Sequence, residues 1–535
     1  MTPIKKILFT AVLAVSPVIL FAQSKEFKVS QSLEIQYDIL KELNKSFVDT
    51  LDIPKLMNTG IVAMLESLDP YTVYMPEEDE EELTMLRTAS YGGIGSIIRK
   101  IDSLGVLITT PYKGSPAVKF GLEPGDVIEK INGEDTKPLT ADQCTSRMKG
   151  QPNTQVTFTV RKGRTGEVKD IVVTRDRVHI PDVSYYGILR DSIGYIRVDG
   201  FTVGGAQDVR NAFISLKEQG IKRLALDLRS NGGGLMDEAV KLLSIFLPKG
   251  TMVVSAKGRA KDANFSYSTT IEPVDTLMPL MVLVNSGSAS SSEIVAGALQ
   301  DLDRAFVVGT RTYGKGLVQS IIPVSYNGKL KVTTAKYYTP SGRCVQALDY
   351  SNRNEDGSVG AVPDSLKKEF KTKLGRSVYD GGGIAPDSTI KAQPYSRPAF
   401  SMVVNDIFGE YAIEFYKKNL SIPPVKEFKL TDEQYADFVE FASKKKFDSR
   451  SDALTHLDKM ISAAKDEDLY EVYKAEFDAL KAKLDIDKKQ MLILKRSEFQ
   501  PLLEEAIVTK YYYTEGSVEK IIQSDDQLHK ALDLF

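Results

Sequence analysis

Hydrophobic and polar positions follow different periods in successive parts of the chain. Apolar residues recur at helical spacing in residues 23–87, which predicts an N-terminal helical region. Residues 88–176 alternate short apolar runs with glycine and proline turns, which predicts a small β-rich module. Residues 177–395 alternate buried-strand runs with amphipathic helices, and residues 396–535 return to helical spacing in a charged background. The pattern therefore predicts a multidomain protein with an α/β core and helical ends.

The chain begins with the pattern of an export signal. Lys5 and Lys6 precede an apolar run over residues 7–22 that ends in a small residue. A positive start, a short apolar stretch and a small final residue are typical of a signal peptide. We therefore expect residues 1–22 to be removed and the protein to be periplasmic. Because Leu20 fits the cleavage site poorly, an uncleaved anchor in the inner membrane stays open as an alternative.

Composition excludes several functions. The formal net charge of −3 provides no basic surface for nucleic acid. The three histidines, His179, His456 and His529, are scattered and no metal-ligand cluster is visible, so we expect neither a metal nor a cofactor. Cys144 and Cys344 lie far apart in the sequence. We expect them to be separate small buried side chains, although an exported protein could pair them.

Residues 285–294, "NSGSASSSEI", contain five serines. Such a composition alone favours a flexible linker. However, the apolar run "MPLMVLV" of residues 278–284 precedes it, and the helix-forming "EIVAGALQDLDRA" begins at Glu293. A tight turn between a buried strand and a helix is a common position for an active-site residue. The segment is therefore a candidate nucleophile turn.

The class of nucleophile depends on its base. The serines do not match G-x-S-x-G, and the nearest downstream histidine, His456, falls in the helical C-terminal region, which argues against a Ser-His-Asp triad. "SNGGGL" has no Walker lysine, which argues against phosphate binding. Lys315, between two glycines, is a candidate base, because a desolvated lysine can accept a proton. Spacing alone leaves an ordinary turn lysine as the alternative.

Four segments together resemble the C-terminal processing peptidases, the family of the bacterial tail-specific proteases. "GSASSSEIVAGALQD" is similar to the family's nucleophile segment, and "GKG" follows at its usual distance. "YYTPSGRCVQ" and "GGGIAPD" match two further segments, with Cys344 in place of a usual serine. The resemblance implies a serine endopeptidase in which Ser290 is the nucleophile, Lys315 the general base and Gln319 the residue that orients the lysine.

The resemblance also implies residues around this dyad. "DLRSNGGGLMDEAV" is similar to the segment that supplies an oxyanion amide, which falls on Gly233 or Gly234, with the Ser291 amide as second donor. Glu293 and Asp301 are candidate supporting groups, although Asp301 could equally be an exposed helix carboxylate. The other serines, Ser286, Ser288 and Ser292, are expected to form turn and helix-cap hydrogen bonds.

The β-rich module resembles a PDZ domain. In that case backbone N–H groups of its glycine loop would bind the terminal carboxylate of a substrate, which adds as a strand. The loop consists of Gly92, Gly93, Ile94 and Gly95. Ile97 and Ile98 follow it and suggest a pocket for apolar terminal side chains, with plain core residues as the alternative.

The resemblance implies a ClpP/crotonase-like peptidase core with a PDZ domain and helical ends. The expected partners are proteins or peptides with apolar C-termini, with an adaptor protein and a homodimer as further options. Two other functions are weighed against it. A catalytically silent PDZ scaffold is disfavoured because Ser290, Lys315 and Gln319 are all present. An acyl-thioester enzyme of the crotonase type is disfavoured by the export signal and the PDZ-like module.

Overall fold

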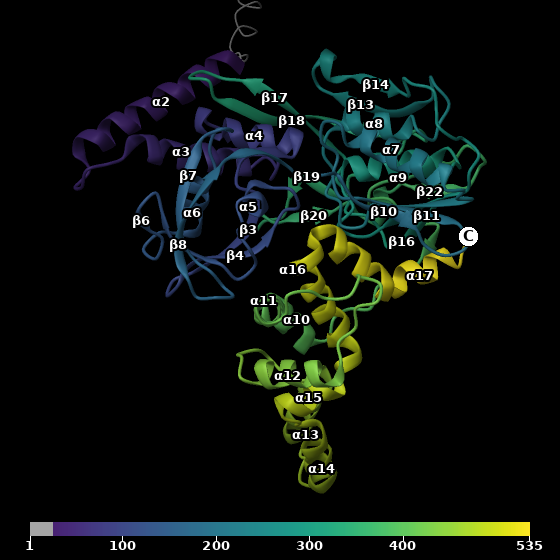
Figure 1. Ribbon diagram of the computed structural model, residues 1–535. Helices are drawn as coiled ribbons and strands as arrows, with labels where there is room; N and C mark the ends of the chain where they lie inside the picture. The colour runs from purple at the N-terminus through teal and green to yellow at the C-terminus, as the bar shows by residue number, and fades with distance from the viewer. Residues whose placement is uncertain (1–24) are drawn as a thin grey trace, which may run out of the picture. The chain divides into compact units, whose positions relative to one another are not determined.

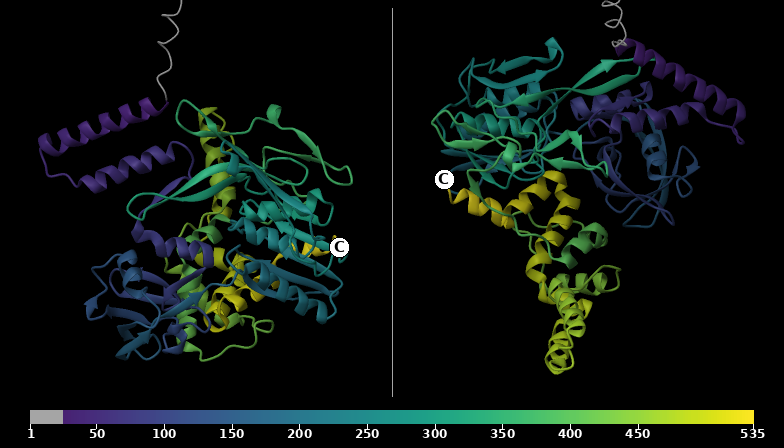
Figure 2. Two further views of the ribbon diagram at one scale, coloured as in Figure 1. Left: turned by 90° about the horizontal axis from the view of Figure 1, so that it is seen from above. Right: turned by 180° about the vertical axis from the view of Figure 1, so that it is seen from behind.

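The structure is a computed structural model, and it describes residues 25–535. The predicted signal peptide lies outside the described residues. Within them, no helix is both long and apolar enough to cross a membrane. The chain divides into two compact units, one made of residues up to Met75 with Ile321–Val332 and the other of Pro76–Ser320 with Thr333–Phe535. Figures 1 and 2 show the elements of both units.

The described residues of the first unit form helices and short strand segments. They include α2 (Lys25–Ser46), α3 (Ile53–Glu66) and β1 (Val73–Met75), and β1 pairs antiparallel with Lys329–Lys331 of β18 (Lys329–Tyr338). Asp52 caps α3 by accepting a hydrogen bond from the Lys55 N–H. Helix α2 buries none of its residues. It therefore leaves exposed apolar side chains, which are Phe27, Val29, Leu33, Ile35, Tyr37 and Ile39.

The second unit begins with a β-rich module, as predicted. Helix α4 (Glu80–Thr88) leads into β2 (Ser90–Gly93), which pairs antiparallel with β9 (Asp176–His179). Between them lies a sheet of order β3-β4-β5-β7-β8, in which β3 is an edge strand. Its elements are β3 (Ser96–Ile101), β4 (Gly105–Pro111), α5 (Pro116–Lys119), β5 (Val127–Ile131), β6 (Glu134–Asp135), α6 (Ala141–Met148), β7 (Gln155–Arg161) and β8 (Val168–Thr174). Ile108, Ile128 and Phe158 are fully buried in its core.

A six-stranded sheet forms the centre of the second unit. Its order is β10-β11-β12-β15-β16-β23, with β10 antiparallel and the others parallel. The strands are β10 (Val183–Ile188), β11 (Ile193–Val198), β12 (Arg223–Asp227), β15 (Leu280–Val284), β16 (Phe306–Gly309) and β23 (Ser388–Thr389). Helices α7 (Gly205–Glu218), α8 (Met236–Leu243) and α9 (Ser291–Asp301) share one hydrophobic core with it. The apolar runs around β12 and β15 are buried strands because both faces of the sheet are covered.

Smaller strands surround this centre. Strand β18 pairs with β17 (Leu317–Pro323) and β13 (Met252–Gly258), and β13 pairs with β14 (Phe265–Ser268). Two short hairpins follow in the chain. They are β19 (Leu348–Arg353) with β20 (Val359–Ala361), and β21 (Glu369–Lys371) with β22 (Ser377–Tyr379).

The C-terminal residues form helices, as predicted. They are α10 (Arg397–Val404), α11 (Ile407–Lys418), α12 (Asp432–Ser443), α13 (Asp452–Asp466), α14 (Lys474–Leu484), α15 (Lys488–Leu494), α16 (Arg496–Ser524) and α17 (Asp526–Leu532). Phe408, Phe438 and Phe499 lie in their own core. Helix α16 is kinked at Tyr513. Beyond the kink the chain packs on the central sheet, where Figure 1 shows α17 beside β16.

The structure confirms the α/β core, the β-rich module and the helical C-terminal region. The residue boundaries assigned to these domains from the sequence stay a prediction. Both cysteines are free thiols, with Cys144 buried in the core of the β-rich module and Cys344 half-buried. The expectation of two separate side chains is therefore correct, whereas the expected burial holds for Cys144 and not fully for Cys344.

Candidate active site

Ser290 lies on a strained turn between a strand and a helix. Strand β15 ends at Val284 and α9 begins at Ser291, with Ser290 at the cap position. The backbone of Ser290 has φ 55° and ψ −112°, a region that residues other than glycine rarely occupy. The Ser290 carbonyl accepts a 3.2 Å hydrogen bond from the buried Tyr337 hydroxyl. The turn is thus held in one unusual conformation, and the serine-rich segment is not a flexible linker.

The neighbouring serines bind the glycine loop of residues 230–234 and the residues just before it, which are distant from them in sequence. The Ser288 hydroxyl donates to the Leu228 carbonyl at 2.7 Å, and the Ser292 hydroxyl donates to the Asn231 carbonyl at 2.9 Å. Both serines are fully buried. The sequence predicted only turn and helix-cap hydrogen bonds for them. Ser288 does form a turn bond, accepting from the Asn285 N–H, but the main role of the pair is to join two loops.

The glycine loop lies directly against Ser290. A Cβ at Gly233 would lie 2.8 Å from the Ser290 Cβ and 2.9 Å from the Ser291 nitrogen, so a side chain is sterically excluded there. The Gly233 N–H donates to Asn231 Oδ1 at 2.9 Å, whereas the Gly234 carbonyl accepts from the Ser291 hydroxyl at 2.9 Å. Among the described residues, the N–H groups of Gly234 and Ser291 have no acceptor. These two amides are therefore the donors available to an oxyanion.

Glu293 connects the Ser290 turn to the loop that carries Lys315. Its Oε2 accepts from the N–H groups of Ser290 and Lys315, at 2.9 and 2.8 Å. Its Oε1 accepts from the Thr312 hydroxyl at 2.6 Å and the Gly314 N–H at 2.8 Å. The carboxylate is fully buried. Burial raises the pKa of Glu293 and the four donors counteract this, with a net upward shift. Sequence reasoning identified Glu293 only as a candidate supporting group, and the structure places it between both loops.

The remaining predicted residues of this region lie further out. Gln319 is on β17, and its amide donates to the Thr333 hydroxyl on β18 at 3.1 Å. Asp301 ends α9, at the opposite end from Ser290. It is buried and accepts a 2.7 Å hydrogen bond from Arg343. The alternative of an exposed helix carboxylate is therefore wrong, and Asp301 supports the chain segment around Arg343 rather than the serine turn.

The glycine loop of the PDZ-like module has free donors beside a free strand edge. Gly92 and Gly93 belong to β2 and pair with β9. The N–H groups of Ile94 and Gly95 have no acceptor among the described residues. Strand β3 starts directly after them and has no neighbour on its outer edge. A peptide could therefore pair with β3 while its terminal carboxylate accepts these two N–H groups.

The two isoleucines after the loop have different environments. Ile98 packs against the core of the module, so the alternative of a plain core residue fits it. Ile97 is 48% exposed on the edge strand. Of these two isoleucines, Ile97 is therefore the one whose side chain a bound peptide could contact.

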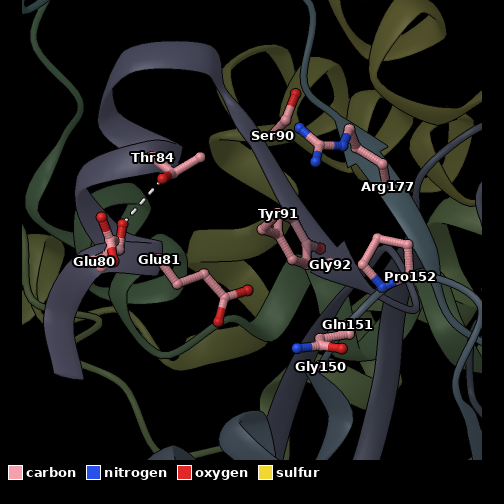
Figure 3. Close-up of a pocket in the computed structure, with 10 residues that line it drawn as sticks. All are labelled: Glu80, Glu81, Thr84, Ser90, Tyr91, Gly92, Gly150, Gln151, Pro152 and Arg177. Carbon is pink, nitrogen blue, oxygen red and sulfur yellow. Dashed lines mark hydrogen bonds between the residues drawn. The ribbon is translucent and has the colours of Figure 1, made fainter. Parts of the chain in front are cut away.

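A cavity of about 320 Å³ lies at the start of this loop. Figure 3 shows Glu81 of α4 on one side of it and Arg177 of β9 on the other, with Gly92 between them. A Cβ at Gly92 would lie 2.1 Å from the Gly150 carbonyl oxygen, so this position requires glycine. Burial and the nearby Tyr112 raise the pKa of Tyr91, which lines the cavity, to about 12. The cavity is therefore lined by an acidic side chain, Glu81, by a basic one, Arg177, and by the neutral phenol of Tyr91.

Three family models match parts of the chain. Residues 192–350 match the model of peptidase family S41, residues 107–162 match a PDZ domain, and residues 399–535 match the C-terminal helical domain of a probable PDZ-protease. Over residues 25–535, no group of three or more His, Cys, Asp or Glu side chains is arranged to hold a metal ion.

Individual relatives carry names of the same family. A carboxy-terminal-processing protease of Bartonella bacilliformis is 36% identical over 315 residues, which are 58% of this chain and 72% of the relative. A probable CtpA-like serine protease of Staphylococcus aureus is 35% identical over 63% of this chain and 68% of its own length. The solved photosystem II D1 C-terminal processing protease is 25% identical over 66% of this chain and 92% of that chain, with a TM-score of 0.35. The chain belongs to peptidase family S41, as a serine peptidase with a PDZ domain.

Proposed function

We propose that the protein is an exported endopeptidase that cuts other proteins near their C-termini, with Ser290 as nucleophile and Lys315 as general base. The observation that carries this proposal is the placement of Ser290. It lies on a strained turn against a glycine loop, and one carboxylate oxygen of Glu293 binds both its N–H and that of Lys315. The family gives the reaction class, and this geometry supports the assignment of Ser290 and Lys315.

The chemistry follows from these positions. The Ser290 hydroxyl oxygen attacks the peptide carbonyl while its proton moves to the neutral amine of Lys315. The resulting oxyanion accepts hydrogen bonds from the Ser291 and Gly234 N–H groups, which strengthen as the charge develops. The C–N bond then breaks, and Lys315 returns the proton to the leaving amine. Water repeats the steps on the acyl-enzyme and releases the acid. By family resemblance, Gln319 orients the lysine.

The PDZ domain would select the substrate by its chain end. The free N–H groups of Ile94 and Gly95 can bind a terminal carboxylate, and the exposed edge of β3 can pair with the preceding residues. Such contacts are charge-assisted, since the acceptor is an anion. We infer that the substrates are proteins or peptides with apolar C-termini.

Two further parts of the proposal concern location and partners. The N-terminal lysines and apolar run indicate export to the periplasm. The exposed apolar side chains of α2, which buries no residue of its own chain, suit a homodimer or an adaptor protein. Mass spectrometry of the mature N-terminus tests the first. An intact Met1 in membrane fractions would show that the N-terminal segment is an uncleaved membrane anchor and not a cleaved signal peptide.

The alternative of a silent PDZ scaffold is separated by one experiment. The wild-type protein and Ser290→Ala are incubated with a protein that ends in a free apolar C-terminus, and the products are identified by mass spectrometry. The proposed peptidase releases C-terminal fragments only with the wild type. A scaffold would bind the substrate equally in both cases and release none.

A further inference from the structure

The last residues of the chain contribute to the peptidase centre itself. Val518 and Ile522 of α16 and Leu528 of α17 are buried in one hydrophobic cluster with the central sheet. The partners on the sheet are Ile193, Tyr195, Ala225, Met281, Leu283 and Val308. Helices α7, α8 and α9 pack against this sheet in a separate hydrophobic cluster. Figure 2 shows the C-terminus beside the sheet, so the final helix covers its second face.

A charged cluster joins this final helix to the end of β12. The Arg229 guanidinium donates to both oxygens of Asp227, at 2.6 to 3.0 Å. It also donates to Asp525 Oδ2 at 2.7 Å and to Gln527 Oε1 at 2.9 Å. Burial alone would raise the pKa of Asp227, but Arg229 lowers it below its ordinary value. The Arg229 side chain is 13% exposed, so its orientation is set by these protein groups rather than by water.

Asp525 and Gln527 are themselves fixed. The Oδ1 of Asp525 accepts the Leu528 N–H at 2.9 Å and caps α17, which leaves Oδ2 for Arg229. Gln527 is buried and donates to the Ile390 carbonyl at 2.6 Å, which leaves Oε1 for Arg229. Each side chain therefore presents one oxygen to Arg229 from a rigid position.

Arg229 immediately precedes the glycine loop. Ser230 follows it with φ 60°, a strained value for a residue other than glycine. Asn231 comes next, and its side chain donates to the Val198 carbonyl at 2.8 Å and accepts from the Gly233 N–H. A strained residue keeps its conformation only where its neighbours are held on both sides. Asn231 supplies one side and Arg229 the other.

We infer that Asp525 and Gln527 are positioning residues for the oxyanion loop, acting through Arg229. The inference rests on the proposed function, in which Gly234 of this loop and Ser291 bind the oxyanion. The C-terminal segment thus takes part in transition-state stabilisation although it does not touch the substrate. A purely structural role of the same contacts would affect stability without affecting the oxyanion.

The test compares Asp525→Asn with Asp526→Asn in the full-length protein. Asparagine still caps a helix, but its amide would place a donor or an uncharged oxygen against Arg229. Asp526, the exposed neighbour, gives the same change of charge. The readouts are the thermal midpoint, kcat and KM on one peptide substrate, binding of a labelled peptide acid by the PDZ domain, and affinity for a peptide boronic acid. The Ser290 oxygen adds to boron and its proton passes to Lys315, so a boron-bound oxygen occupies the oxyanion position.

Removal of a whole oxyanion donor costs about a hundred- to a thousandfold in kcat, so displacement of the loop should cost about three- to thirtyfold. We expect kcat and boronate affinity to fall by this same factor in Asp525→Asn, with KM and peptide-acid binding unchanged. In Asp525→Glu, which keeps the carboxylate, kcat and boronate affinity should be partly restored. Gln527→Met should act in the same direction, and it serves if Asp525→Asn does not fold.

Equal boronate affinity in Asp525→Asn and Asp526→Asn would overturn the inference, as would a loss of peptide-acid binding as large as the loss of kcat. Failure of the proposed function looks different. In that case the wild type itself would neither cleave the peptide nor bind the boronic acid at Ser290.

Discussion

The backbone N–H groups of Ser290 and Lys315 donate to the same atom, Oε2 of Glu293, at 2.9 and 2.8 Å. The Ser290 turn and the loop that carries Lys315 therefore share one buried acceptor. Any displacement of this carboxylate changes the position of both residues at once. In the proposed mechanism Glu293 is therefore a positioning residue, and its loss should affect the reaction more than substrate binding.

Glu293→Gln should lower kcat with little change in KM. Glutamine keeps the shape but replaces one acceptor oxygen by an amide that donates, so two of the four donors lose their partner. An unsatisfied buried donor costs about 1–3 kcal/mol, which corresponds to about five- to 160-fold in rate if this cost falls on the transition state. Steady-state kinetics on one peptide, with peptide-acid binding measured in parallel, checks this. Wild-type kcat in Glu293→Gln would mean that the shared acceptor does not set the geometry of the dyad.

Asp301→Asn is the matched control on the same helix. Asp301 and Arg343 form a buried ion pair with side-chain exposures of 0% and 1%, and breaking such a pair costs about 3–5 kcal/mol. Because Asp301 lies at the far end of α9 from Ser290, the thermal midpoint should fall while kcat, measured well below it, stays near wild type. A loss of kcat as large as in Glu293→Gln would show that helix α9 transmits strain along its whole length.

The contrast between these two carboxylates shows what the sequence could and could not predict. Ser290 and Lys315 belong to short motifs between recognisable elements, so the candidate dyad was visible in the sequence. The partners of Asp301 and Glu293 were not. Arg343 lies 42 residues from Asp301, and the Lys315 N–H lies 22 residues from Glu293. Such hydrogen bonds depend on how strands and helices pack, and the periodicity of side chains in the sequence does not predict them.

The same limit applies to the two loops around Ser290. Ser288 donates to a carbonyl 60 residues away, and Arg229 binds Asp525 across 296 residues. By contrast, the α/β core, the β-rich module and the C-terminal helices follow from local patterns of apolar residues and turns. The sequence therefore predicts which elements form, and only the folded chain shows which polar side chains join them.

Ser290→Ala and Lys315→Ala should each abolish peptide cleavage without lowering the thermal midpoint. The two losses should not add in the double variant, because nucleophile and base act as one unit. Cleavage of a labelled protein and thermal unfolding are measured for the three variants. If Ser290→Ala kept wild-type turnover while Ser288→Ala lost it, the assignment of Ser290 as nucleophile would be wrong.

The rate of cleavage should rise with pH from neutral values upward. Lys315 can accept the Ser290 proton only as a neutral amine, and a free lysine has a pKa of about 10.4. Deprotonation therefore increases the active fraction, and the rising limb follows the titration of this amine. Substrate binding to Ser290→Ala at each pH separates affinity from chemistry. A flat profile of kcat from acid to alkaline pH would contradict lysine as the base.

A free C-terminal carboxylate should accelerate cleavage although it is not the bond that is cut. The N–H groups of Ile94 and Gly95 have no acceptor among the described residues, and β3 beside them is an edge strand. A carboxylate there forms charge-assisted hydrogen bonds, whereas a terminal amide loses the charge and turns a donor toward donors. The loss should be about 1.5–3 kcal/mol, or about ten- to a hundredfold in affinity.

The measurement compares one protein substrate that ends in Val-Ala as free acid, as amide, and with a terminal Asp-Asp. We expect the apolar free acid to be cleaved fastest, because Ile97 is exposed on the outer face of β3 and a bound chain would lie along its edge. A short fluorogenic peptide that ends just after the cleaved bond is the control. It reports on Ser290 and Lys315 without the tail, and an excess of free Val-Ala peptide acid should slow the long substrate by competing for the same loop. Equal cleavage of acid and amide would mean that the PDZ domain does not bind the chain end, and tail recognition would then be lost from the proposed function even if the Ser290–Lys315 chemistry held.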